Sequence, residues 1–101
     1  MSAERQEKNE QEIARSREAQ QIMNTPIFVE SMAKLKQGII DLWAACPARD
    51  TPGREWLWQH YQVALRFEEE LNTILNTGKL ALKEREMSLA ERVGQKIRSI
   101  V

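Results

Sequence analysis

The sequence predicts an all-α protein built from an antiparallel helical hairpin, a third packed helix and a polar helical arm at the N-terminus. The first observation is composition, because Glu, Gln, Arg, Lys, Ala and Leu dominate and these residues favour helices. The second is that apolar residues recur every three or four positions in three segments. The third is a Thr-Pro pair at 25–26 and again at 51–52, a pattern typical of a helix start.

Residues 1–24 form the predicted polar arm, which we separate from a three-helix domain over residues 25–101. The few apolar residues of the arm share no common face. Oppositely charged residues such as Glu4 and Lys8 stand one turn apart, and each such pair stabilises a helix by only ~0.2–0.5 kcal/mol. A helix that is polar on all sides is usually frayed or ordered by a partner.

Residues 26–45 and 52–76 are the predicted helices of the hairpin. Pro47 ends the first helix, Thr51 or Asp50 caps the second, and so short a connection favours antiparallel helices. The predicted seam of the first helix consists of Phe28, Met32, Leu35, Ile39, Leu42 and Cys46. The predicted apolar face of the second consists of Trp56, Leu57, His60, Val63, Ala64, Phe67, Leu71, Ile74 and Leu75.

Gly78 marks the predicted end of the second helix, since a glycine suits the left-handed conformation that follows many helices. We therefore expect a third helix over residues 80–100. Its apolar stripe consists of Leu82, Leu89, Ala90, Val93, Ile97 and Ile100. From residue 78 onward the chain has six basic and three acidic residues, which makes this segment locally basic.

The residues needed for catalysis or metal binding are scarce. The chain has one histidine and one cysteine, whereas a protein metal site takes three or four ligands. Cys46 and His60 could face each other across the hairpin, but no third residue is available to orient the pair. We interpret His60 as a histidine of the helical core, expect neither metal nor cofactor, and prefer a non-enzymatic function to an enzymatic one.

A second apolar patch points to protein binding. Trp58 is rotated by about 200° from Trp56, and Tyr61 and Leu65 lie toward its side of the helix. This patch is either covered by another part of the chain or is an association surface. We favour the association surface, and hence a homo-oligomer or a subunit docked on a larger structural protein.

The charge balance argues against a dedicated nucleic-acid binder, because 15 basic and 15 acidic residues cancel. The alternative is a small nucleic-acid-associated or regulatory protein that uses the basic C-terminal helix through Arg85, Arg92, Lys96 and Arg98. The lone cysteine and the polar N-terminus predict a cytoplasmic protein without a signal peptide. The longest apolar run, "LWAAC", is far too short to span a membrane.

Three stretches resemble a group of small helical proteins that tailed bacteriophages encode near head-morphogenesis genes, generally without an assigned activity. They are "NTP" at 24–26, "LWAACPARDTPGREWLW" at 42–58 and "LNTGKLA" at 75–81. The residues that carry the resemblance are Trp43, Pro47, Arg49, Asp50, Gly53, Arg54, Glu55, Trp58, Gly78 and Lys79. The resemblance implies a role in virion assembly or as a phage accessory protein, in the host cytoplasm or the virion.

Overall fold

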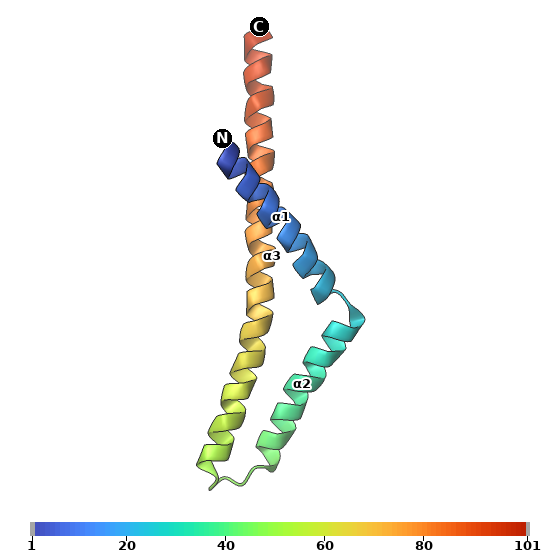
Figure 1. Ribbon diagram of the computed structural model, residues 1–101, viewed down its shortest axis with the longest axis vertical. Helices are drawn as coiled ribbons and strands as arrows, with labels where there is room; N and C mark the ends of the chain where they lie inside the picture. The colour runs from blue at the N-terminus through green and yellow to red at the C-terminus, as the bar shows by residue number, and fades with distance from the viewer. Residues whose placement is uncertain (1, 101) are drawn as a thin grey trace. The chain divides into compact units, whose positions relative to one another are not determined.

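Helices make up most of the described part of the chain, as the sequence predicted, but there are three of them and not four. The structure is a computed structural model that describes residues 2–100, and the side chains of residues 2–97. Helix α1 spans Ala3–Met23, α2 spans Pro26–Ala45 and α3 spans Thr51–Ile100 (Figure 1). No strand occurs among these residues, so the all-α class is confirmed.

The chain divides into two compact units. We name them the hairpin unit, Gln21–Asn72, and the crossing unit, which combines Met1–Gln20 with Thr73–Val101. The hairpin unit contains α2 and the first part of α3, and the crossing unit contains most of α1 and the remainder of α3.

Helix α2 starts at Pro26, but Thr25 does not cap it as expected. Thr25 occupies the N-cap position with an extended backbone, and its carbonyl accepts the first helical bond from the Val29 N–H at 3.1 Å. Its hydroxyl instead donates backward to the carbonyls of Gln21 and Ile22. The last carbonyls of a helix lack helical partners, and these acceptors take the hydroxyl that would otherwise cap α2.

Asp50 is the residue that caps α3. Its Oδ1 accepts a hydrogen bond from the Gly53 N–H at 3.1 Å, and its carbonyl accepts one from the Arg54 N–H at 3.0 Å. Upstream, the Asp50 N–H closes a turn onto the Pro47 carbonyl at 3.0 Å. The chain thus reverses direction between α2 and α3 through local hydrogen bonds, and the two helices run antiparallel (Figure 1).

The contact between α2 and α3 in the hairpin unit is rotated relative to the predicted seam. Leu35 and Leu42 were expected to face α3, but they are 51% and 59% exposed, whereas Lys36 and Trp43 are half-buried. The half-buried residues of α2 and of its C-cap are Phe28, Met32, Lys36, Ile39, Trp43 and Cys46. They face a strip of buried and half-buried residues on α3: Arg54, Leu57, Tyr61, Ala64, Glu68 and Leu71.

The apolar face of α3 is wider than its single neighbour can cover. Leu57 and Ala64 are buried as predicted, but Trp56, Val63 and Phe67 are each more than half exposed. A helix packed against one partner hides only a narrow stripe of its surface, and an apolar stripe wider than this stays exposed. The prediction that the whole face is interior is therefore wrong.

Helix α3 continues through Gly78, so the predicted break and the separate helix over 80–100 are also wrong. No described glycine has a positive φ. Gly78 is buried, and a Cβ atom at this position would lie 2.1 Å from the Ser16 Cβ and 2.8 Å from the Glu12 carbonyl oxygen. A glycine occupies this position because α1 crosses α3 there at close range. It does not mark a turn at the end of a helix.

The crossing unit orders the polar arm as helix α1. The buried residues of α1 are Asn9, Ile13, Ser16 and Ala19. Gly78 and Ala81 of α3 are buried in the same unit, and side chains this small let two helices approach closely. Two ion pairs, Arg5–Glu84 and Glu10–Arg85, link the helices beyond the crossing point.

Replacing Gly78 with alanine tests this close approach. Alanine favours a helix over glycine by ~1 kcal/mol, yet we expect Gly78→Ala to destabilise the chain by about 1–3 kcal/mol, because its methyl group would overlap Ser16. The matched control is Gly94→Ala, since a Cβ there meets no atom within 4 Å and should be neutral or stabilising. Urea unfolding and amide exchange across α1 measure both changes. Equal effects of the two substitutions would contradict the close approach.

Candidate protein-binding site

Arg54 holds the corner of the hairpin unit together. Its guanidinium lies over the Trp43 ring, 4.3 Å from the ring centroid. The same side chain donates from Nη1 to the carbonyl oxygens of Cys46 at 3.2 Å and Trp43 at 3.5 Å. A cation at a helix C-terminus satisfies carbonyls that have no helical partner, and it opposes the negative end of the helix dipole. Arg54 thereby fixes the position of the Trp43 ring.

One flank of the hairpin unit carries an apolar groove of about 280 Å³, which we name the Trp58 groove. Its lining residues are Ile39, Ile40, Trp43, Trp58 and Tyr61. The structure thus brings Trp58 and Tyr61 together, as the sequence predicted, and adds three α2 residues that residue spacing within one helix could not reveal. Leu65 is 37% exposed and lies outside the lining of the groove, one heptad beyond Trp58 on α3.

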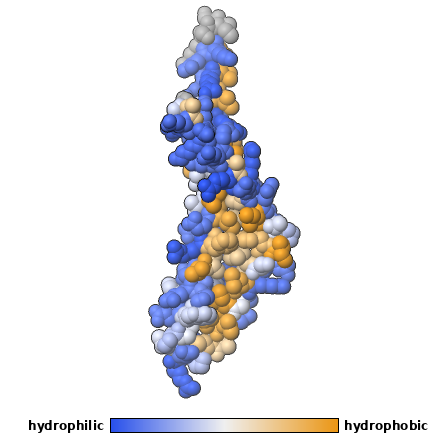
Figure 2. Space-filling view, in the orientation of Figure 1, coloured by the Kyte–Doolittle hydropathy of each residue, from blue (hydrophilic) through white to orange (hydrophobic). Residues whose placement is uncertain are grey.

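The opposite flank carries a larger apolar surface, which we name the broad face. Its members are Phe28, Leu35, Leu42, Trp56, Val63 and Phe67. Trp56 and Trp58 point to opposite flanks because two residues turn a helix by about 200°. The rings of Phe28 and Phe67, with centroids 6.2 Å apart, join the two helices on this flank. In Figure 2, apolar surface extends across both helices of the hairpin unit.

An ion pair lies between the two helices of the hairpin. Lys36 Nζ is 2.8 Å from Glu68 Oε1, and both side chains are less than one third exposed. The contact with the Glu68 carboxylate raises the pKa of Lys36, while partial desolvation opposes the rise. Lys36 therefore stays charged at neutral pH, and the pair adds polar character to the α2–α3 contact.

Cys46 and His60 do not form the pair that catalysis would need. Cys46 Sγ lies 3.7 Å from Asp50 Oδ2, and burial followed by the negative charge of Asp50 raises the pKa of the thiol. His60 is exposed, so its interpretation as a core residue is wrong. The His60 ring stacks on Trp56 with centroids 3.7 Å apart, and Nδ1 donates to the Trp56 carbonyl at 2.9 Å. Within the described residues, no group of three or more His, Cys, Asp or Glu could hold a metal ion.

The predicted nucleic-acid face lies in the crossing unit, where part of its charge is matched. Arg85 Nη1 lies 3.0 and 3.3 Å from the two carboxylate oxygens of Glu10. Arg92 is exposed and lines the same hollow of about 270 Å³ as Arg85 and Glu10. Lys96 is exposed, and the side chain of Arg98 lies outside the described residues.

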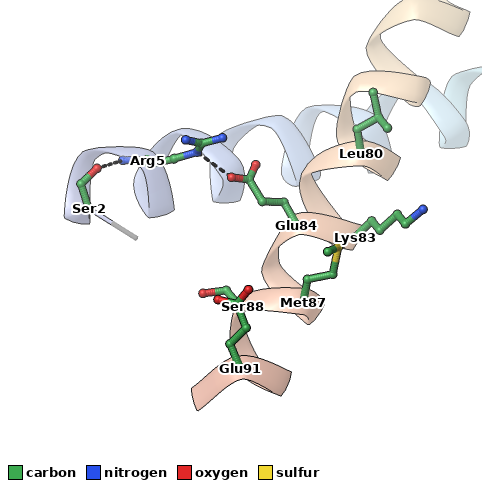
Figure 3. A pocket seen from close by; sticks show the side chains of 8 residues that line it. All are labelled: Ser2, Arg5, Leu80, Lys83, Glu84, Met87, Ser88 and Glu91. Carbon is green, nitrogen blue, oxygen red and sulfur yellow. Dashed lines mark hydrogen bonds and ion pairs between the residues drawn. The ribbon is translucent and has the colours of Figure 1, made fainter. Parts of the chain in front are cut away.

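A second hollow of the crossing unit, about 610 Å³, is shown in Figure 3. The Arg5 side chain of α1 points toward Glu84 of α3, and Ser2 Oγ accepts a hydrogen bond from the Arg5 N–H at 3.2 Å. The remaining lining residues are Leu80, Lys83, Met87, Ser88 and Glu91. The walls are exposed or half-buried and carry charges of both signs, so they favour no particular charged ligand.

No protein-family model, curated protein or solved structure matches this chain. In the part that the structure describes, none of the helices combines the length and the apolar character needed to cross a membrane. The geometry of the hairpin unit, with the Trp58 groove on one flank and the broad face on the other, is therefore the basis for a functional proposal.

Substitution of Arg54 tests whether the corner depends on its guanidinium group. We expect Arg54→Ala to lower the free energy of unfolding by about 1–3 kcal/mol, because two carbonyl contacts and the stacking on Trp43 are lost. Arg54→Lys should recover only part of this, since lysine keeps the charge without the planar fork. Exposed Arg49 is the control, and Arg49→Ala should change stability by less than ~0.5 kcal/mol. Chemical denaturation gives all three values, and equal losses for Arg54→Ala and Arg49→Ala would contradict the role of Arg54.

Proposed function

We propose that the protein is a non-enzymatic structural or assembly subunit that acts by binding other protein chains through its hairpin unit. The observation that carries the proposal is the exposure of large apolar side chains on both flanks of this unit. Contiguous apolar patches of more than a few hundred Å² are rare on monomeric proteins and mark interaction surfaces.

The Trp58 groove has the chemistry of a protein contact. Tryptophan and tyrosine are enriched among the residues that contribute most of the binding energy at interfaces. Such residues usually lie in pockets from which the partner excludes water. Trp58 is 54% exposed and can still lose much of its surface to a partner. The floor of the groove is held in place, because Arg54 fixes the Trp43 ring.

The surroundings of Cys46 and His60 support the non-enzymatic part of the proposal. A thiol whose pKa is raised is less often the reactive thiolate at neutral pH, and its neighbour is a carboxylate that would repel the negative form. His60 uses Nδ1 to bind a backbone carbonyl four residues earlier in the same helix. Neither group activates the other, so a nucleophilic mechanism gains no support.

The resemblance to small helical proteins of tailed bacteriophages extends the proposal to virion assembly or an accessory role in phage growth. Assembly subunits act by contact with copies of themselves or with other structural proteins, and exposed apolar faces serve such contacts. The proposed location is the host cytoplasm or the virion.

Trp58→Ala tests the groove as an association surface. Because Trp58 is over half exposed, we expect the dissociated mutant to keep its helicity and to lose less than ~1 kcal/mol of stability. Binding of whichever chain occupies the groove should weaken by roughly tenfold or more, as for other interface tryptophans. Light scattering over a concentration series detects self-association, and a photocrosslinking side chain at position 62 detects another partner. Gln59→Ala, also exposed, is the control.

Two results would contradict the groove as a binding surface. A loss of ~3–5 kcal/mol with unchanged oligomer mass would make Trp58 a core residue. A chain that stays monomeric and gives no crosslinked product at position 62 would have no partner at this groove.

The nucleic-acid alternative receives less support, since Arg85 is paired with Glu10. We expect no saturable binding of a labelled DNA duplex or single-stranded RNA by fluorescence anisotropy at ~50 mM salt, where phosphate contacts are strongest. The reverse result would be binding at ~50 mM that weakens steeply by ~200 mM and is lost in Arg92→Ala. Lys34→Ala, which changes an exposed lysine of the hairpin unit, is the matched control.

A further inference from the structure

We propose that the broad face binds a second copy of this chain, so that two hairpin units form a four-helix bundle. This inference rests on the proposed function and names the partner of one of its two surfaces. Two antiparallel helices from each chain would then share the core that one hairpin lacks, the arrangement that four-helix bundles use.

The size of the broad face suits a dimer. Helices of about 20 residues are ~30 Å long, and two helices side by side are ~20 Å wide including their side chains. The face is therefore on the order of 600 Å² before surface roughness is counted. Each partner of a standard protein interface buries ~800 Å², so the face is close to what a stable dimer requires.

The charge of the broad face also favours a second copy. At about 100° per residue, no Lys, Arg, Asp or Glu of α2 or of the first part of α3 points within about 40° of the centre of this flank. A two-fold dimer buries the same surface of both chains, so a charge at its centre would be buried in each chain with no opposite charge on this face to pair with. The opposite flank is less suitable, since Glu69 and Gln62 share it with Trp58.

Small and large residues on the broad face complement each other. Ser31 and Gly38 of α2 point toward this flank, and Gly38 lies between the aliphatic side chains of Leu35 and Leu42 along the helix. A Cβ atom at Gly38 would meet nothing within 4 Å, so packing inside the chain does not account for this glycine in mid-helix. An approaching aromatic side chain would fill that space.

The register of the hairpin places the exposed aromatic side chains of α3 at about the same height along the helix axis as the small residues of α2. Trp43 lies level with Arg54, and Phe28 lies level with Phe67. Phe67 is therefore within about one turn of Ser31 along the hairpin, and Trp56 within about one turn of Gly38. A two-fold axis parallel to the helices would bring α3 of one chain against α2 of the other, with Phe67 and Trp56 over the small residues.

Neighbouring positions of α2 provide a matched pair of charge substitutions. Leu42 points to the broad face, and Ile40, two residues earlier, lines the Trp58 groove on the other flank. We expect the wild-type chain to sediment as a dimer, Leu42→Lys to raise the dimer dissociation constant at least 100-fold, and Ile40→Lys to change it less than threefold. Sedimentation equilibrium over a concentration series measures the constants, and circular dichroism verifies that both variants remain helical.

Gly38→Leu tests whether a second chain approaches α2 closely at this position, without disturbing the fold of the single chain. Leucine favours a helix over glycine and has open space in the isolated chain, so loss of the fold would not explain a lost dimer. We expect Gly38→Leu to raise the dissociation constant at least tenfold without loss of helicity. Gly94→Leu makes the same change at an open position of the crossing unit and should leave the constant unchanged. A dimer that Gly38→Leu leaves intact would overturn the proposed register.

The outcomes distinguish this inference from the proposed function. A dimer lost in Ile40→Lys but kept in Leu42→Lys would overturn the inference, because the second copy would occupy the groove. A monomer that crosslinks to a different protein would overturn it as well, and the proposed function would stand in both cases. A chain that is monomeric at every concentration and gives no crosslinked product with a photocrosslinking side chain at position 62 or at position 35 on the broad face would overturn both.

Discussion

Two helices that pack only against each other bury one narrow strip of surface each. This limited burial determines how the hairpin unit is built. Leu57 and Ala64 are the only buried apolar residues of this unit among those described, and α2 has none. Apolar burial is the main favourable term in folding, at ~25 cal/mol per Å². A hairpin that leaves Trp56, Val63 and Phe67 in water therefore forgoes stabilisation that a further helix layer would supply.

Because the buried core is small, a few polar contacts and one close steric contact determine how the helices are positioned within each unit. Arg54 joins the end of α2 to the start of α3 through the Trp43 ring and two carbonyls, and Asp50 caps α3 in the same corner. In the crossing unit, Gly78 permits a close approach to Ser16 that any side chain would prevent. The corner depends on two residues and the close approach of α1 on one, so the position of each helix within its unit rests on a few specific contacts.

The two flanks of the hairpin differ in a way that suits two kinds of contact. The broad face is wide and has no Lys, Arg, Asp or Glu near its centre, which suits an interface between identical chains. The Trp58 groove is narrower, lies beside polar residues and offers two aromatic rings to an incoming side chain. Because the flanks are opposite, a chain that uses one for a second copy keeps the other for a different subunit, and this combination is what an assembly protein needs.

The sequence by itself determined the helical class, the ends of α2, the corner and the two-sided apolar character of residues 52–67. These features follow from local chemistry: the Pro at the start of α2, Pro47 after its end, the Asp50 cap and the helical spacing of apolar residues. The patch of Trp58 and Tyr61 could be found in this way because residue spacing sets the direction of each side chain.

Only the tertiary structure decided which side of each helix is covered. Lys36 and Trp43 face α3 in place of Leu35 and Leu42 because Glu68 and Arg54 offer them partners, and such pairings join residues distant in sequence. Gly78 could end a helix or admit a neighbour, and local sequence does not distinguish these roles. The crossing of α1 made it a contact point within one continuous helix, since Ser16 occupies the space where a side chain would be.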